Sequence, residues 1–449
     1  MKIITHRAGA PRLVLHTLTL LLLVWSVPSP LAFAQRPAPP PQPYRLTAED
    51  EAFLEDLQRR SFQYFYDHAD PSTGLVLDRA RADGTRHDAS HPSHRIASSA
   101  ATGFGLSALC IAAERGWIPR REARERVVKT LRFYDERAAH MKGWFLHWMD
   151  APTGERRWQS EYSSIDTALL LAGVLTARGY FQNDAEVRRL ATRVYERVNF
   201  PWMLARHPTL LSHGWKPETG FLKPRWDTYS EHLILQLLAI GSPAHPITPR
   251  AWLAWRRERI TYGGYTYITG GPLFVHQYSH AWADFRGRRE GWYPHTDYFE
   301  NSVAATRAHR QFCIDLAPEF PGYTADVWGI TASDSARGYT AWGGPPRHPD
   351  IDGTVVPAAA GGSLMFTPDI SLRALREMKE RYGERIYGRY AFIDAFNPTT
   401  GWTNPDVIGI DIGPVLLSAE NLRSGNVWRW FMRNGEIPRA MRSVGLRRQ

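Results

Sequence analysis

Cysteine is nearly absent from this sequence of 449 residues, which contains only Cys110 and Cys313. Each lies inside an apolar helical pattern, where a buried free thiol is the ordinary outcome. A single disulfide between them is the alternative interpretation. In either case, the fold does not depend on a disulfide framework.

Dense clusters of positive charge are also lacking, although the formal net charge is +10. Lysine and arginine are spread along the chain, and no block is dense enough to follow a phosphate backbone, which argues against nucleic acid as a partner. A dinucleotide-binding loop is lacking as well. Gly103 and Gly105 resemble half of one, but no strand precedes them, so they predict close helix packing and no bound cofactor.

Long apolar runs are confined to the N-terminus. Basic residues, an apolar run over residues 13–24 and small residues up to Ala34 are typical of a signal peptide over residues 1–34. A membrane anchor is the alternative, but His16 interrupts the run, which is shorter than the ~20 residues of a bilayer span. Prolines make residues 35–46 a stiff linker, and residues 47–449 then form one domain. We expect an exported, monomeric protein, periplasmic or extracellular, with no stable membrane anchor after cleavage.

The alternation that a large sheet requires is missing, and helical periodicity dominates instead. Thr47 and Asp50 form a helix-opening pair ahead of an apolar stripe. Amphipathic or apolar helices are predicted over residues 47–68, 98–115, 119–137, 163–180 and 184–198. Only residues 145–150 and 261–269 suggest strands, and both are short.

A second type of helix consists mainly of small and apolar residues and follows a polar, aromatic loop. Six such helices are predicted to begin near Ser98, Ser163, Tyr229, Asn301, Val355 and Asp411. Helices that are apolar on nearly every side must be surrounded by protein. Six inner helices, each paired with an amphipathic outer one, predict an all-α fold of the (α/α)6 barrel type. A helical solenoid is the alternative, but its repeats should resemble one another in sequence, and these do not.

Acidic side chains gather where these inner helices begin. They are Glu161, Asp166, Asp227, Glu231, Glu300 and Asp411. Any one of them could simply cap a helix, because a carboxylate is favoured at the positive end of the helix dipole. If the inner helices run parallel, however, their starts open on one face and the carboxylates converge there.

Convergent carboxyl groups are what glycoside hydrolysis requires. One must stay protonated to donate to the leaving oxygen, while another, ionised, activates water or attacks the sugar. Apolar and aromatic neighbours of Glu231 should raise its pKa by desolvation, so we predict that Glu231 is the general acid. Asp411 and Glu161 are the leading candidates for the base, and Asp166 is a further catalytic candidate.

Aromatic residues are abundant, with 17 Trp, 19 Tyr and 19 Phe. Tryptophans in polar, Gly- and Pro-rich segments often stack on the apolar faces of sugars, although some rings simply close the core. The predicted stacking residues are Trp158, Trp215, Trp226, Trp282, Trp328 and Trp402. The predicted polar contacts to a sugar are Asp227, Tyr229, His276, His280, Arg286, Glu300 and Asp334.

Two histidines in this set also have a spacing that can hold zinc, because His276 and His280 lie one helical turn apart. The segment lacks the glutamate of a metalloprotease motif, and the neighbouring Tyr278 and Arg286 suit the recognition of sugar hydroxyls. We therefore predict substrate contact or structural hydrogen bonding for the two imidazoles, and no metal.

Seven longer segments carry a family resemblance. They are ATGFGLSALCIAAERGW, SSIDTALLLAGVLTARGYF, RWDTYSEHLILQLLAIGSP, FVHQYSHAWADFRG, YFENSVAATRAHRQFCI, WGITASD and GPVLLSAENLRSGNVWRWFM. Together they resemble glycoside hydrolase family 144, the β-1,2-glucanases with a glucoamylase-like domain, from about Phe53 to the last Trp-containing helix. The resemblance implies an (α/α)6 barrel that hydrolyses linear β-1,2-glucan to sophorose or short sophorooligosaccharides with inversion. It also implies that the family's acidic positions fall on Glu161 and Glu231.

Other functions remain open at the level of sequence. One is a non-catalytic periplasmic glycan-binding protein with the same aromatic residues. Loss of a catalytic carboxyl group would favour it, yet the acidic residues are all present. Another is a glucoamylase-type hydrolase or transglycosylase that acts on a different glucan, which the release of reducing ends from β-1,2-glucan and from starch would distinguish.

Overall fold

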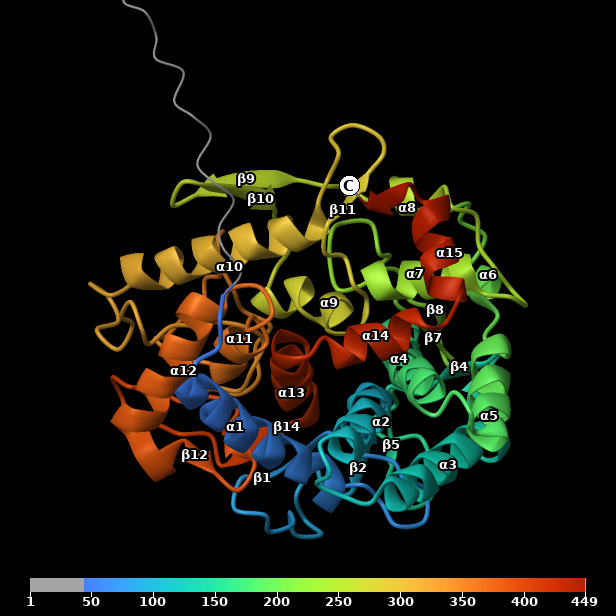
Figure 1. The fold of residues 1–449 in the computed structure, drawn as a ribbon, viewed down its shortest axis with the longest axis horizontal. Coiled ribbons are helices and arrows are strands. Elements are labelled where there is room, and N and C mark those ends of the chain that lie inside the picture. Colours follow the sequence, from blue (N-terminus) through green and yellow to red (C-terminus); the bar gives the residue numbers. More distant parts are fainter. Residues whose placement is uncertain (1–43, 449) are drawn as a thin grey trace, which may run out of the picture. The chain divides into compact units, whose positions relative to one another are not determined.

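The structure is a computed structural model that describes residues 44–448 (Figure 1). The predicted signal peptide and residues 35–43 of the predicted linker lie outside the described residues. Helices dominate the described part, and its strands form only two- and three-stranded sheets, as predicted. None of the helices between Tyr44 and Arg448 has both the length and the apolar character needed to span a bilayer.

Central helices alternate along the chain with peripheral ones. The central helices are α2 (Ser99–Glu114), α4 (Ser164–Tyr180), α7 (Leu233–Gly241), α9 (Tyr278–Trp282), α11 (Pro357–Gly361) and α13 (Gly409–Arg423). The peripheral helices are α1 (Ala48–Asp67), α3 (Arg120–Glu136), α5 (Ala185–Glu196), α8 (Ala251–Ala254), α10 (Tyr298–Asp315) and α12 (Pro368–Tyr382). Further short helices are α6 (Phe200–Met203), α14 (Asn426–Met432), α15 (Glu436–Ser443), η1 (Leu273–His276) and η2 (Gly383–Arg385). In Figure 1 the red α13 lies among α2, α9 and α11, and these are helices that it contacts.

Several predicted helix boundaries are confirmed, because they depend on local capping. Thr47 and Asp50 form a capping box at the start of α1: the Thr47 hydroxyl accepts from the Asp50 N–H, and the Asp50 carboxylate accepts from the Thr47 N–H at 2.9 Å. Ser98 and Ser163 cap α2 and α4 in the same manner with their side-chain oxygens. The central helices therefore begin where the serines predicted.

Glycine allows α2 and α4 to approach until their backbones touch. A Cβ atom on Gly103 would lie 2.2 Å from the carbonyl oxygen of Leu169, and one on Gly173 would lie 2.0 Å from the carbonyl oxygen of Gly103. No side chain fits at either position. The prediction that Gly103 serves close helix packing is confirmed.

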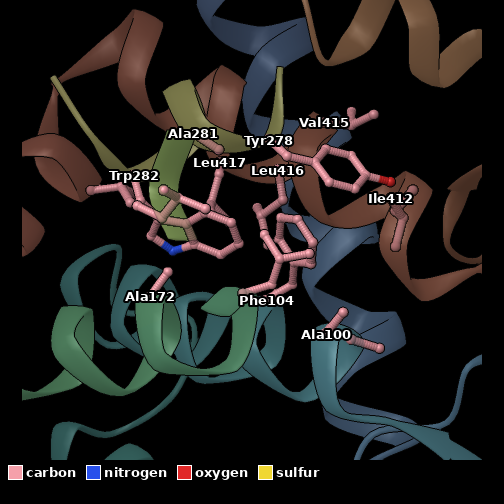
Figure 2. Packing of buried hydrophobic residues seen from close by; sticks show 14 of the residues in the cluster. Ala100, Phe104, Ala172, Tyr278, Ala281, Trp282, Ile412, Val415, Leu416 and Leu417 are labelled. Carbon is pink, nitrogen blue, oxygen red and sulfur yellow. The ribbon is translucent and has the colours of Figure 1, made fainter. Parts of the chain in front are cut away.

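The core between the central helices is filled by aromatic and aliphatic side chains (Figure 2). The rings of Phe104 and Trp282 lie 4.5 Å apart between their centroids, and the Trp282 indole donates a hydrogen bond to Ser107 at 2.9 Å. Because the polar end of this tryptophan is paired, its whole ring can be buried at little cost. Cys110 and Cys313 are buried free thiols, as the first interpretation of the sequence expected.

One predicted inner helix is wrong. The segment beginning near Asn301 belongs to α10, which is peripheral: it buries one face and packs against β9 (Arg259–Tyr262) and β10 (Tyr265–Ile268). The central position is occupied by α9, all five residues of which are buried. A run of small residues suits the contact face of a peripheral helix as well as a central helix, so composition alone does not separate the two.

Short strands lead into several central helices. The remaining strands are β1 (Arg79–Arg81), β2 (Ile96–Ser98), β3 (His140–Met141), β4 (Trp144–Phe145), β5 (Trp148–Asp150), β6 (Tyr162–Ser163), β7 (Gly214–Lys216), β8 (Gly220–Phe221), β11 (Arg288–Glu290), β12 (Tyr387–Gly388), β13 (Ala391–Phe392), β14 (Asp406–Ile408) and β15 (Leu446–Arg448). β2, β6 and β14 end at the first residues of α2, α4 and α13, and they pair with β5, β7 and β1. This pairing fixes the N-terminal ends of three central helices, and two of them, α4 and α13, carry Asp166 and Asp411 in their first turns.

Candidate active site

Glu161 and Asp166 are joined by a histidine that the sequence did not single out. His147 Nδ1 lies 2.9 Å from Glu161 Oε1, and His147 Nε2 lies 3.4 Å from Asp166 Oδ1. Burial lowers the pKa of His147, but the two carboxylates outweigh burial and raise it. The imidazole is therefore protonated more readily than a free one, and its charged form donates from Nδ1 to Glu161 while Nε2 lies within ion-pair distance of Asp166.

The pKa values of Glu161 and Asp166 are shifted in opposite directions. Burial raises the pKa of Glu161, but the hydrogen bond and charge of His147 reverse the effect and hold it below its usual value. Asp166 is more deeply buried, so desolvation raises its pKa despite His147 and the hydroxyl of Ser163, which donates to Asp166 at 2.6 Å. Glu161 is the member that stays ionised.

These three residues also form a possible cation site. One ligand atom from each of His147, Glu161 and Asp166 lies within 4.8 Å of the others, the separation that a single metal ion needs. A histidine can coordinate only through an unprotonated nitrogen. The raised pKa of His147, its hydrogen bond with Glu161 and its ion-pair distance to Asp166 fit a charged imidazole between two carboxylates better than a coordination shell.

Glu231 lies in the turn before α7 and is 9 % exposed. Burial raises its pKa, and the charge of Asp166 raises it further, while a hydrogen bond from the Ser230 hydroxyl acts in the opposite direction. The backbone of this turn is held by Ser279 of α9, which donates to the Glu231 carbonyl at 2.5 Å and accepts from the Ile234 N–H at 2.9 Å. The result is a positioned carboxyl group with a raised pKa, as predicted for an acid.

Asp411 in the first turn of α13 is paired with Asp394, a carboxyl group that the sequence did not suggest. Both are buried, at 6 % and 3 % exposure. Desolvation raises the pKa of Asp394 to about 6, and desolvation together with the charge of Asp394 raises the pKa of Asp411 well above its usual value. Two adjacent carboxyl groups in a buried site cannot both ionise, so the pair holds one proton between them at neutral pH.

A hydrogen-bond network fixes this pair. Asn404 donates to Asp394 at 2.9 Å and to Asp334 at 3.0 Å, and the Asp334 N–H donates to Asp394 at 2.9 Å. Arg79 closes the network by donating to Asp334 at 2.6 Å. Asp334, which was predicted as a sugar contact, therefore belongs to the network around Asp394 and Asp411 and forms an ion pair with Arg79.

The phenol of Tyr278 is affected by the charges of three predicted catalytic residues, Asp166, Glu231 and Asp411. Tyr278 at the start of α9 donates its hydroxyl to the Ile410 carbonyl at 2.8 Å, next to Asp411. Its pKa is raised first by burial and then by the charges of Asp411, Glu231 and Asp166. The N-terminal ends of α4, α7, α9 and α13 thus bring these acidic residues to one rim, which we call the acidic rim.

Two predicted stacking tryptophans lie near this rim and are accessible. Trp158 is 46 % exposed and packs edge-on against Trp148, whose indole donates to Asp78 at 3.1 Å. Trp215 is half-buried on β7, where it pairs with Tyr162, the residue that follows Glu161. Trp402 is also half-buried, on the loop between β13 and β14.

The other predicted stacking residues are covered by protein. Trp282 and Trp328 are 0 % exposed. Trp226 donates its indole N–H to Ser164 at the start of α4, but His213 and His232 stack on it at centroid distances of 3.9 and 5.6 Å. The predicted stacking role of these three rings is corrected: each fills the core between helices, as aromatic residues in loops also do.

Tyr229, His276 and His280 are corrected for the same reason. They are 2 %, 3 % and 1 % exposed, and they pack among aromatic rings; the ring of Tyr229 lies 4.9 Å from that of His276. Burial lowers the pKa of both histidines to about 3, so they are neutral core residues. His276 ends the short helix η1 and His280 lies in α9, and the burial of both elements is what the sequence did not reveal.

Arg286 and Glu300 lie away from the shared carboxyl groups. Arg286 pairs with Asp284 at 2.8 Å and lies 3.9 Å above the ring of Trp428, beyond the C-terminal end of α13. Glu300 is exposed on the peripheral helix α10. The predicted sugar contacts of these two residues are therefore corrected. Asp227 is half-exposed and pairs with Arg256 at 3.5 Å, and its sugar contact stays a prediction.

Comparison with known proteins gives consistent matches. Residues 223–435 match a family model described as "Putative glucoamylase". An exo β-1,2-glucooligosaccharide sophorohydrolase of Parabacteroides distasonis is 30 % identical over 434 residues, a match that covers 88 % of this chain. The chain spans 58 % of the length of that relative.

Two solved structures are similar over nearly their whole length. A protein of Bacteroides fragilis described as a "putative glucoamylase" has a TM-score of 0.81 and 30 % identity, and the match covers 92 % of this chain and 100 % of that one. The endo-β-1,2-glucanase of Chitinophaga pinensis, in complex with sophorotriose and glucose, has a TM-score of 0.80 and 29 % identity over 90 % and 99 % of the two chains.

Proposed function

Because the chain belongs to the glucoamylase-like family of β-1,2-glucanases, glycoside hydrolase family 144, we propose that it hydrolyses β-1,2-glucan to sophorose or short sophorooligosaccharides. The observation that carries the proposal is that adjacent residues of α9 tie together the segments of two candidate carboxyl groups: Tyr278 donates to the Ile410 carbonyl beside Asp411, and Ser279 donates to the Glu231 carbonyl. The named relatives act on this linkage, one releasing sophorose units and the other cutting within the chain.

In this proposal Glu231 is the general acid. A general acid must hold its proton at the working pH, and burial raises the pKa of Glu231 without a cation beside it to oppose the effect. The contacts of Ser279 hold the backbone of the turn from which the Glu231 side chain extends. Its proton passes to the glycosidic oxygen as the bond to the anomeric carbon breaks.

The general base is one of two carboxyl groups, and they differ in how they would act. Glu161 is held ionised by His147 and can accept a proton from water directly. Asp411 shares a proton with Asp394, so it can act once that proton rests on its partner. With inversion, the carboxyl groups of Glu231 and the base should lie roughly 6.5–9.5 Å apart, which leaves room for the attacking water.

We further propose that the central and peripheral helices form an (α/α)6 barrel. Their alternation along the chain and the contacts of α13 with α2, α9 and α11 support it. The basic, then apolar, then small-residue order of the first 34 residues supports export to the periplasm or beyond.

The experiment is incubation of the purified protein with linear β-1,2-glucan and, separately, with starch. Chromatographic sizing of the products and detection of the anomer first formed should show sophorose or sophorooligosaccharides with the inverted, α configuration. A ladder of products indicates internal cleavage, and sophorose alone indicates release from an end. Folded protein that cuts starch and leaves β-1,2-glucan intact would overturn the proposal.

A further inference from the structure

The end of α13 opposite Asp411 opens into a cavity of about 660 Å³ in which arginine is the most frequent lining residue. Its lining arginines are Arg286, Arg288, Arg423, Arg429, Arg433 and Arg448. Asp411 is in the first turn of α13 and Arg423 ends it, so the cavity lies about 18 Å along the helix from the acidic rim. No residue of the acidic rim lines it.

Two arginine-rich segments that are far apart in the sequence meet at this cavity. β11 and β15 pair antiparallel, which places Arg288 opposite Arg448 and Arg289 opposite Arg447. Figure 1 shows β11 close to the C-terminal end of the chain. Like charges directly opposite one another on paired strands destabilise a sheet. The register of β11 and β15 therefore includes repulsion between facing arginines, which a bound anion would reduce.

Few negative charges offset the arginines. Asp284 is the only carboxylate in the lining, and it is used by Arg286. Arg423 forms ion pairs with Glu51 and Glu55, each at 2.8 Å.

The other lining arginines, Arg288, Arg429, Arg433 and Arg448, form no ion pair with a carboxylate anywhere in residues 44–448. Burial lowers the pKa of Arg288, and the charges of Arg448 and Arg442 lower it further. Arg288 and Arg433 donate to the backbone carbonyls of Asp284 and Gly179, and Arg429 donates to the side chain of Asn426, so three of the four positive charges have polar partners, and none has a carboxylate partner in the described part of the chain.

We propose that this cavity, the arginine pocket, binds a phosphate group. Guanidinium groups donate paired N–H bonds in a geometry that matches phosphate oxygens, and such charge-assisted bonds are stronger than neutral ones. The volume is typical of a small-molecule site. The phosphate belongs either to a soluble phosphate or phosphate ester or to a lipid headgroup. The pocket is separate from glucan hydrolysis, so its occupancy is independent of the proposed function.

The test is isothermal titration with inorganic phosphate in buffers whose ionic strength is kept constant with chloride. The wild type should bind phosphate saturably, and the double variant Arg288→Gln/Arg448→Gln should bind it at least about tenfold more weakly. The matched control is Arg121→Gln/Arg373→Gln, which removes two equally exposed or more exposed arginines from α3 and α12. This control should bind phosphate as the wild type does.

Sedimentation with vesicles separates the two sources of phosphate. Vesicles of phosphatidylglycerol are compared with vesicles of phosphatidylcholine for all three proteins. Saturable binding of free phosphate that depends on Arg288 and Arg448 supports the pocket as a site for soluble phosphates. Retention only on phosphatidylglycerol, with the same dependence, supports a headgroup site. If neither probe distinguishes the folded double variant from the control, the proposal is overturned.

Discussion

His147 Nδ1 and Glu161 Oε1 lie 2.9 Å apart, and this contact keeps the pKa of Glu161 below its usual value although the group is largely buried. Burial alone would have raised the pKa of Glu161. The histidine therefore decides whether this carboxyl group can serve as a base.

Replacing His147 tests that role. In His147→Gln the nearby positive charge is lost, so the pKa of Glu161 rises. If Glu161 is the base, the acidic limb of the kcat/KM profile moves to higher pH, because the base must lose its proton before it acts. The measurement is the pH dependence of glucan hydrolysis between pH 4 and 9. An acidic limb that stays in place would remove Glu161 from the role and leave Asp411.

Asp394→Asn should change how stability depends on pH. The pKa of Asp394 is about 6 in the folded protein and about 3.9 in an unfolded chain, so the folded state binds more protons between these values. The free energy of unfolding of the wild type therefore receives a contribution that is complete below about pH 4 and is lost as the pH rises through about 6.

Denaturant unfolding at several pH values checks this. The decrease between pH 4 and 7 should be smaller in Asp394→Asn than in the wild type. Asp350→Asn, an exposed control with a side chain 64 % accessible, should reproduce the wild-type curve. Parallel curves for wild type and Asp394→Asn would show that Asp394 is not the group that holds the proton.

Trp158 should contribute to substrate binding and not to folding. It is 46 % exposed, so Trp158→Ala should leave the melting temperature nearly unchanged. The stacking interaction of one ring contributes about 0.5–1.5 kcal/mol to binding. Its loss should raise KM about twofold to twelvefold, with a smaller effect on kcat. Steady-state kinetics on β-1,2-glucan measure this. Trp158→Phe should restore most of the affinity, and unchanged kinetics in the alanine variant would place the ring outside the substrate path.

Local signals in the sequence predicted much of the helical frame. The capping box at Thr47 and Asp50 and the serines before α2 and α4 act within one helical turn, so a short window of sequence contains all the information. Glu161, Asp166, Glu231 and Asp411 were found for the same reason, because each stands at the start of a recognisable apolar helix. Their placement beside one another is what a parallel course of the central helices predicts.

The remaining features depend on contacts between distant segments. Asp394 stands in a loop without periodicity, and its importance comes from Asp411, which belongs to the next helix. His147 is significant only because β4 and β5 place it against Glu161. Trp282 and His280 have loop-like neighbours in the sequence but lie on a central helix. Pairing and burial of this kind are set by tertiary packing, which composition and spacing do not encode.

The role of Glu231 is tested most directly by the rate at which Glu231→Gln releases reducing ends from linear β-1,2-glucan. The substitution keeps the shape of the side chain but removes the proton that the leaving oxygen needs, so turnover should fall by about 10²- to 10⁴-fold while the melting temperature is retained. Glu300→Gln, the same change at an exposed glutamate of the peripheral helix α10, should hydrolyse the glucan at nearly the wild-type rate. A folded Glu231→Gln protein with wild-type turnover would contradict the account.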